Sequence, residues 1–107
     1  MSSVFEEIAG LDKLIHEPAR LAILTILSDV ESADFLALQR LTGLTSGNLS
    51  VHLSKLADGK LITYDKRIVG KKTRTQVRIT AAGQKALERH WSRLESFRAD
   101  VKKSNAA

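Results

Sequence analysis

Residues 42–59, TGLTSGNLSVHLSKLADG, decide the fold of this chain. Leu49, Leu53 and Leu56 follow one another at spacings of four and three residues, so they form one apolar stripe on a helix that starts at Thr45. The hydroxyl of Thr45 can cap the first turn of this helix by accepting a backbone hydrogen bond. The stretch therefore predicts an amphipathic helix with one buried face.

A shorter helix is expected just before this one, over residues 35–42. Its apolar residues share one side: Phe35, Leu38 and Leu41. Gly43 permits a tight turn between the two helices, and Gly59 suits the position just past the end of the second. Two helices joined by a glycine turn predict a helix-turn-helix at residues 35–59.

The outer face of the second helix carries small or hydrogen-bonding side chains and no carboxylate. A carboxylate would be repelled by a phosphate backbone, whereas a small polar group can approach a base edge closely. This pattern is typical of a helix that contacts DNA. The residues expected to make the contact are Thr45, Ser46, Asn48, Ser50, Val51, Ser54 and Lys55.

Three residues near this helix have two interpretations each. Asn48 can pair with adenine through its amide, or it can bond the backbone of the first helical turn. His52 lies at the rim of the apolar stripe, where a packed histidine is favoured over a DNA contact. Arg20, upstream, is expected to form a structural ion pair rather than to hold a phosphate.

Residues 61–80 predict a β-hairpin, because apolar and polar residues alternate on both sides of a glycine-containing tip. Ile62, Tyr64 and Ile68 are expected on the side that faces the core. The segment from Lys60 to Arg78 carries a charge of +6, whereas the whole chain carries +5. A cationic hairpin on a near-neutral body indicates a polyanionic partner, and its expected phosphate clamp is Arg67, Lys71, Lys72 and Arg74.

Three more helices are expected. The first spans Val4 to Ile15, the central core helix follows Pro18, and the last starts after Thr80 and runs to about Val101. The first and last helices carry narrow apolar seams that so small a domain would struggle to cover. The seam residues are Val4, Ile8, Leu11 and Ile15 in the first helix and Leu87, Trp91, Leu94, Phe97 and Val101 in the last.

Composition narrows the class of protein. A length of 107 residues indicates one domain, 1–107, and no apolar run is long enough to span a membrane. The N-terminus does not resemble a signal peptide, and the absence of cysteine excludes disulfides and is compatible with a cytoplasmic location. Catalytic motifs, phosphate loops and histidine–carboxylate metal spacings are missing, so no enzyme, cofactor or metal is expected.

The order of these elements resembles the winged helix–turn–helix transcriptional regulators of the ArsR/MarR type, in particular a compact single-domain group. Three motifs carry the resemblance: PARLAIL at residues 18–24, NLSVHL at 48–53 and ITAAG at 79–83. They are similar to the opening of the core helix, to the recognition helix and to the segment after the wing. The resemblance covers residues 18 to about 87.

The resemblance implies a mainly α fold with a β-hairpin wing at residues 61–80. The recognition helix would enter the major groove of double-stranded DNA, and the wing would touch the backbone or an adjacent minor groove. Helices at residues 1–16 and 81–101, with the seams named above, would pair two chains into a homodimer on a palindromic site. Metal sensing is not expected, because cysteine is absent and the three histidines lie far apart in the sequence.

Two other functions stay open. A winged helix can serve as a protein–protein module, but that would need apolar groups on the recognition face, where only Val51 qualifies. A charge-driven binder of DNA or RNA is the other, and binding to unpaired RNA bases would favour exposed aromatic residues on the hairpin. Whether a small-molecule effector exists is not decided by the sequence.

Overall fold

The computed structural model describes residues 3–106, and it is mainly helical with one small antiparallel sheet. The expected fold class is confirmed. The elements in chain order are α1 (Val4–Ala9), α2 (Pro18–Ser28), β1 (Ala33–Asp34), α3 (Phe35–Thr42), α4 (Ser46–Asp58), β2 (Ile62–Val69), β3 (Lys72–Ile79) and α5 (Ala81–Ala106).

The core is built around α2, which contacts α3, α4, β3 and α5. Pro18 occupies the first turn of α2, and the carboxylate of Glu17 caps it by accepting from the backbone N–H of Arg20 at 2.8 Å. Fully buried aliphatic side chains of α2 pack against those of α3, α4 and the strands. These buried side chains include Ile23, Leu24 and Leu27 of α2, Leu38 of α3, Leu49 and Leu56 of α4, Ile62 of β2 and Val77 of β3.

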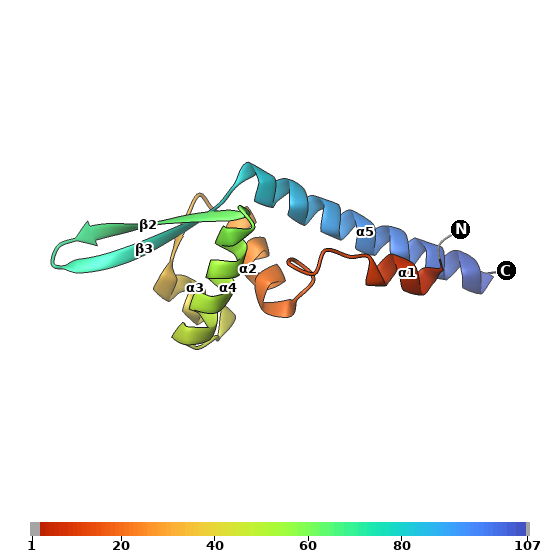
Figure 1. Cartoon of the computed structure of the whole chain (residues 1–107), viewed down its shortest axis with the longest axis horizontal. Coiled ribbons are helices and arrows are strands. Elements are labelled where there is room, and N and C mark those ends of the chain that lie inside the picture. Colours follow the sequence, from red (N-terminus) through yellow and green to blue (C-terminus); the bar gives the residue numbers. More distant parts are fainter. Residues whose placement is uncertain (1–2, 107) are drawn as a thin grey trace.

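The sheet has the strand order β1-β3-β2, and a two-residue turn with Gly70 at a φ of 65° joins β2 to β3. The expected faces of the hairpin are correct, since Tyr64 is opposite the buried Val77, but the expectation that this face is covered by the core is wrong beyond Ile62. Ile62 is buried, but Tyr64 is 46% exposed and Ile68 is 81% exposed. The hairpin overhangs the body of the protein, so its outer part has no core to face (Figure 1).

The expected first helix is wrong in its length, because α1 ends at Ala9. Gly10 caps its C-terminus, and Asp12 then accepts hydrogen bonds from the backbone of Leu14 and His16 in a turn. Glycine and aspartate both favour such a turn over a continuing helix.

At its other end the chain forms one long helix. Thr80 caps α5 through a 2.9 Å bond from the backbone N–H of Gly83, and the helix continues to Ala106 instead of fraying after Val101. A β-carbon at Gly83 would overlap the carbonyl oxygen of Leu61, so only glycine lets α5 approach the chain there. Trp91, in the apolar seam expected for this helix, is 43% exposed in the single chain.

The molecule is elongated, with extents of 64 × 25 × 21 Å and a radius of gyration of 16.7 Å. A compact chain of this length would have a radius of about 13 Å. The wing projects at one end, and α5 with α1 alongside it projects at the other, where both termini lie (Figure 1). No helix among residues 3–106 is long and apolar enough to cross a membrane.

Candidate nucleic-acid interface

The helix-turn-helix forms where it was expected. Gly43 takes a left-handed φ of 72°, and its backbone N–H bonds the carbonyl of Gln39 to close α3. Thr45 caps α4 by accepting from the backbone N–H of Asn48 at 3.1 Å. Gly59 ends α4 without a left-handed φ, and the residue with positive φ is Lys60 at 63°. A β-carbon at Gly59 would instead meet the side chain of Leu14.

The residues expected to touch DNA lie together on the surface of α4. All of them are exposed, including Val51 at 52%, while Leu49, Leu53 and Leu56 on the opposite face are buried. The sequence reasoning passed over Asp58, which is exposed four residues after Ser54 and so extends the same face. This face is therefore free of carboxylates along most of its length and acidic at its C-terminal end.

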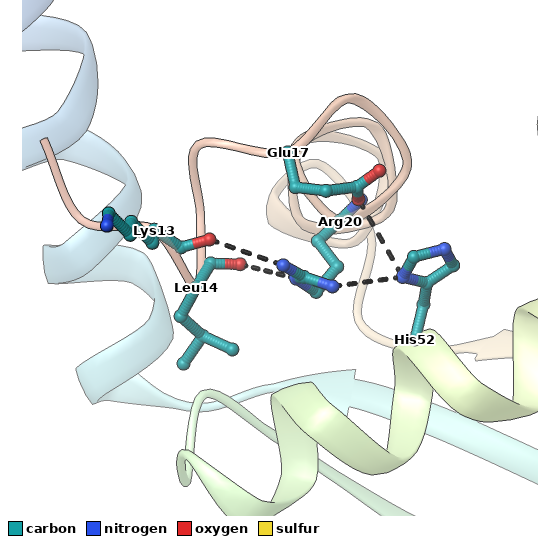
Figure 2. A network of polar contacts seen from close by, with 5 residues as sticks. All are labelled: Lys13, Leu14, Glu17, Arg20 and His52. Carbon is teal, nitrogen blue, oxygen red and sulfur yellow. Dashed lines mark hydrogen bonds and ion pairs between the residues drawn. The ribbon is translucent and has the colours of Figure 1, made fainter. Parts of the chain in front are cut away.

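One flank of α4 is tied to the start of α2 by a polar network (Figure 2). Arg20 is only 9% exposed, and its guanidinium donates to the carbonyl oxygens of Leu14 at 2.6 Å and Lys13 at 3.2 Å. Its third contact is Nδ1 of His52 at 3.2 Å, which must accept because a guanidinium only donates. Arg20 and His52 therefore have structural positions, and His52 bonds a side chain rather than the expected backbone group.

Glu17 completes this network. Its carboxylate lies 3.7 Å from Nδ1 of His52. Burial acts to raise the pKa of Glu17, but hydrogen bonds from the backbone N–H groups of Arg20 and Ala19, together with the nearby positive charge of Arg20, lower it overall. Glu17 is thus held ionised, which fixes the N-terminus of α2 against the recognition face.

The wing concentrates positive charge across its two strands. Arg67 and Arg74 are directly opposite each other in the register of β2 and β3. Like charges opposed in this way repel one another. Asp65, 3.7 Å from Arg67, and Asp34, 4.0 Å from Arg74, offset part of the repulsion.

The Arg67–Asp65 pair is solvent-exposed and the Arg74–Asp34 pair is half-buried with a long separation, so both are weak and a phosphate can compete with the carboxylate. Lys71 and Lys72 lie at the tip of the wing, both exposed. Sequence reasoning did not foresee that Ile68 and Val69 beside them would be exposed, at 81% and 60%, because alternation alone does not reveal how far a hairpin extends beyond the core.

The residues expected in a dimer interface divide into two groups. Leu11, Ile15 and Leu87 are 5%, 1% and 5% exposed, so they are already buried within one chain and the expectation for them is wrong. The remaining residues lie on α1 and α5, along the projecting arm, and keep part of their surface exposed: Val4, Ile8, Trp91, Leu94, Phe97 and Val101.

Two histidines that are distant in the sequence meet where the arm joins the body. Nδ1 of His16 lies 3.5 Å from Nε2 of His90, and His90 is 2% exposed. Burial lowers the pKa of His90, and the neighbouring His16 lowers it further. Among the residues that the structure describes, no group of three or more potential metal ligands is found.

The chain is similar to a family of known proteins. A family model described as a winged helix DNA-binding domain matches residues 19–97. The chain belongs to the winged helix DNA-binding domain family. The match includes the core helix α2, the helix-turn-helix formed by α3 and α4, and the wing formed by β2 and β3.

Individual proteins and solved structures are also similar to this chain. An uncharacterized protein of Methanocaldococcus jannaschii is 30% identical over 78 residues, which make up 73% of this chain and 85% of that protein. The structure of a transcriptional regulator homologue from Pyrococcus horikoshii OT3 has a TM-score of 0.81 at 30% identity and covers 90% of this chain and 97% of that chain. A MarR-family regulator from Silicibacter pomeroyi shares the fold at 19% identity, with a TM-score of 0.63 and coverage of 92% and 63%.

Proposed function

We propose that this winged helix protein is a transcriptional regulator that reads the sequence of a palindromic site in double-stranded DNA as a homodimer. One observation carries the proposal. Seven exposed residues lie on the outer face or in the first turn of α4, and all of them except Val51 are small polar residues or a lysine. The wing beside them carries two arginines, Arg67 and Arg74, directly opposite each other. The similarity to proteins described as transcriptional regulators supports the regulatory part.

In this proposal α4 is the recognition helix and lies in the major groove. Asn48 reads adenine through its amide, and Val51 contacts a thymine methyl group. Val51 is 52% exposed, so its methyl groups are free to make this contact. The remaining residues bond phosphates or base edges: Thr45, Ser46, Ser50, Ser54 and Lys55.

In this proposal the wing binds DNA through its positive charge and does not read the base sequence. Arg67, Arg74, Lys71 and Lys72 contact phosphates, and one of them can enter a narrow minor groove. Each phosphate neutralised on duplex DNA adds about −0.9 to the slope of the logarithm of affinity against the logarithm of salt concentration. A dimer that contacts about 6–8 phosphates would therefore bind with strong salt dependence.

In this proposal the projecting arm, formed by α1 and α5, makes the dimer interface. The partly exposed apolar residues of α1 and α5 would be covered by the same surface of a second chain, as a two-fold axis requires. Phe5, which is 74% exposed on α1, extends this surface although its spacing kept it out of the expected seam. The two recognition helices would then address half-sites about 34–36 Å apart.

The experiment compares two variants on a selected site and on random duplex DNA. Asn48→Ala should weaken binding to the selected site by about 1–3 kcal/mol and leave binding to random DNA unchanged. Lys71→Ala combined with Lys72→Ala should weaken both alike and reduce the salt slope. The matched control for the asparagine variant is Asn105→Ala, and the matched control for the lysine variant is Lys102→Ala with Lys103→Ala. These exposed residues lie near the end of α5.

Equal losses from the Asn48 and lysine variants on both DNAs would rule out base reading by Asn48. A salt slope that responds equally to the wing lysines and to Lys102 and Lys103 would rule out the wing as the phosphate clamp.

A further inference from the structure

One edge of the wing is open beside the start of α3. The strand order is β1-β3-β2, and β1 contributes only Ala33 and Asp34, whose partners in β3 are Val77 and Gln76. After Asp34 the chain turns into α3. The outer half of β3, residues 72–75, is therefore paired with β2 on one side and, among the residues that the structure describes, with no strand on the other.

The register identifies the backbone groups of β3 that face this edge. The backbone N–H of Thr80 donates to the carbonyl oxygen of Leu61 at 3.0 Å, one position beyond the last pair of the hairpin. Successive residues of an antiparallel strand direct their N–H and C=O groups alternately to its two sides. Counted back from Thr80, the residues that face away from β2 include Val77, Thr75 and Thr73. Val77 meets β1, so the backbone groups of Thr75 and Thr73 are directed to the open edge, which can accept a further strand.

A groove with a volume of about 280 Å³ lies along this edge. Its walls are the start of α3 and the outer half of β3, and its lining residues are Asp34, Phe35, Leu36, Lys72, Thr73, Arg74 and Thr75. Leu36 is 54% exposed, so most of the contact surface of this leucine is available to a partner. The groove thus combines an open strand edge with an apolar side chain and two cations.

The two faces of an added strand would meet different chemistry. Lys72 and Arg74 share one face of β3, because their positions differ by two. Thr73 and Thr75 share the other face. Phe35 lies on the side of Thr75, since both also line a second cleft, between α4 and the hairpin. An added strand would therefore need acidic side chains on one face and apolar side chains on the other.

The short strand β1 already shows this alternation. Ala33 packs against the core, and the carboxylate of Asp34 lies 4.0 Å from Arg74. Asp34 also caps α3, because it accepts from the backbone N–H of Ala37 at 2.7 Å. The ion pair of Arg74 is therefore long and weak, and a carboxylate on an added strand can compete for this arginine.

We propose that the open edge of β3 binds an extended segment of a partner protein in which acidic and apolar residues alternate. The segment continues the sheet beyond β1, and its backbone bonds Thr73 and Thr75. Its carboxylates contact Lys72 and Arg74, and its apolar side chains pack on Leu36. A second copy of this chain fits the edge less well, because the cations of two β3 edges would face one another.

This binding would have a consequence for DNA. Lys72 and Arg74 also belong to the phosphate clamp proposed above, so the segment and DNA should compete for the wing. A partner that carries such a segment would release the protein from DNA. The consequence rests on the proposed function, whereas the docking site itself does not require DNA.

The test uses the full chain and a capped synthetic peptide of alternating glutamate and valine. NMR spectra of the isotope-labelled protein should show shift changes confined to residues 34–36 and 72–76, together with slower amide hydrogen exchange at Thr73 and Thr75. Two control peptides should not give this pattern. One alternates lysine and valine, and the other has the composition of the first with its glutamates and valines in separate blocks.

Proline substitutions test the edge itself, because proline lacks the backbone N–H. Thr73→Pro removes a donor from the open edge and should abolish peptide binding. Ile68→Pro is the matched control, since Ile68 is opposite Thr73 and directs its backbone groups to the other side of the hairpin. This control should bind the peptide like wild type. Unchanged signals from the body of the protein would show that both variants fold.

Side-chain variants test the two faces of the added strand. Arg74→Gln should weaken peptide binding about two- to five-fold, as the loss of one surface ion pair would, and Arg67→Gln, one strand further away, should weaken it less. Leu36→Ser should weaken binding several-fold. Leu41→Ser should not, because Leu41 is an exposed leucine of α3 that does not line the groove.

Three results would overturn the docking site. They are binding that survives Thr73→Pro, equal binding of the glutamate and lysine peptides, and no shift changes at this edge with about 1 mM glutamate peptide. If the protein selects a DNA sequence but the peptide does not bind, the docking site fails and the proposed function stands. If the peptide binds at this edge but no DNA sequence is selected, the proposed function fails and the docking site stands.

Discussion

Arg20 links three segments of the chain through one guanidinium. It holds the carbonyl oxygens of Lys13 and Leu14 on one side and the ring of His52 on the other (Figure 2). A buried guanidinium that satisfies this many acceptors leaves each of them unpaired when it is removed. The position of α4 relative to α2 therefore depends on a side chain that does not itself lie on the outer face of α4.

Arg20→Ala should lower the free energy of unfolding by about 2–3 kcal/mol, because two carbonyl oxygens and His52 lose their donor. Urea denaturation followed by circular dichroism would measure the change. Arg98→Ala, an exposed arginine on α5, is the control and should stay within about 0.5 kcal/mol of wild type. Equal stability of the two variants would contradict the structural role of Arg20.

His90 gives a prediction about pH. Burial lowers its pKa below the ordinary value of 6.5, with His16 and Arg93 acting in the same direction and Asp12 opposing them. The unfolded chain therefore takes up a proton more readily than the folded one. Stability at this site is complete above about pH 6.5 and is lost as the pH falls toward the lowered pKa.

Denaturant unfolding at pH 7.5, 6.5 and 5.5 would show this loss as a falling midpoint. His90→Gln should remove the part of the decline that lies just below pH 6.5, because glutamine does not titrate. A variant that declined as steeply as wild type in this interval would show that another group is responsible.

Gly83 and Gly47 both lie in helices, but only Gly83 packs closely against another segment of the chain. Gly83 lets the first turn of α5 approach the carbonyl of Leu61, and a β-carbon there would also lie 2.7 Å from Cγ1 of Ile79. Gly47 is exposed near the start of α4, and a β-carbon there would meet nothing within 4 Å.

Gly83→Ala should lower the free energy of unfolding by about 1–3 kcal/mol, since backbone must move to admit the methyl group. Gly47→Ala should raise it by about 0.5–1 kcal/mol, because alanine loses less backbone entropy in a helix. Thermal unfolding of the two variants beside wild type would measure both. A stabilising Gly83→Ala would contradict the close packing of α5 on the chain before it.

The sequence predicted the positions of α3 and α4 well, because capping residues and apolar spacing agreed in α4 and a glycine turn separated the two helices. The expected apolar side of α3 is only partly correct, since Leu38 is buried but Leu41 is 67% exposed. The prediction failed for α1, where an apolar spacing of four and three residues continued through Gly10 although the helix did not. It also failed for Tyr64 on the wing, because alternation defines two faces of a hairpin but not where the body beneath it ends. The cleft between α4 and the hairpin, which Lys66 lines, could not be predicted from the sequence for the same reason.

The network around Arg20 and the contact of His16 with His90 could not be predicted either. Each joins residues separated by 32 or 74 positions, and no local pattern relates such pairs. The recognition face, in contrast, lies within one helix, and the spacing of Leu49, Leu53 and Leu56 was sufficient to define it.

The whole molecule has the form of a body with two projections. Beyond the body, α5 is accompanied only by the short α1 among the described elements, and Trp91 and Phe5 keep 43% and 74% of their surface exposed. Large exposed apolar side chains on a projecting arm are typical of an interface. The dimer proposed above would cover them.

Trp91→Glu combined with Phe97→Glu should convert the dimer to a monomer, because two carboxylates per chain would have to be buried at the interface. Sedimentation velocity would measure the change in mass, and DNA affinity should fall because half-sites would be bound singly. Ser92→Glu, at an exposed neighbouring position, is the control and should remain dimeric. A wild-type protein that sediments as a monomer at tens of micromolar would contradict the dimer.

The central claim is that α4 reads DNA sequence within a two-fold dimer, and selection from random duplex DNA tests it most directly. The purified protein would be challenged at about 0.15 M salt, where nonspecific binding is weak. A two-fold dimer that reads sequence should enrich an inverted repeat with half-sites about one helical turn apart. Binding that disappears in salt, with no enriched motif, would contradict sequence reading and leave a charge-driven contact in its place.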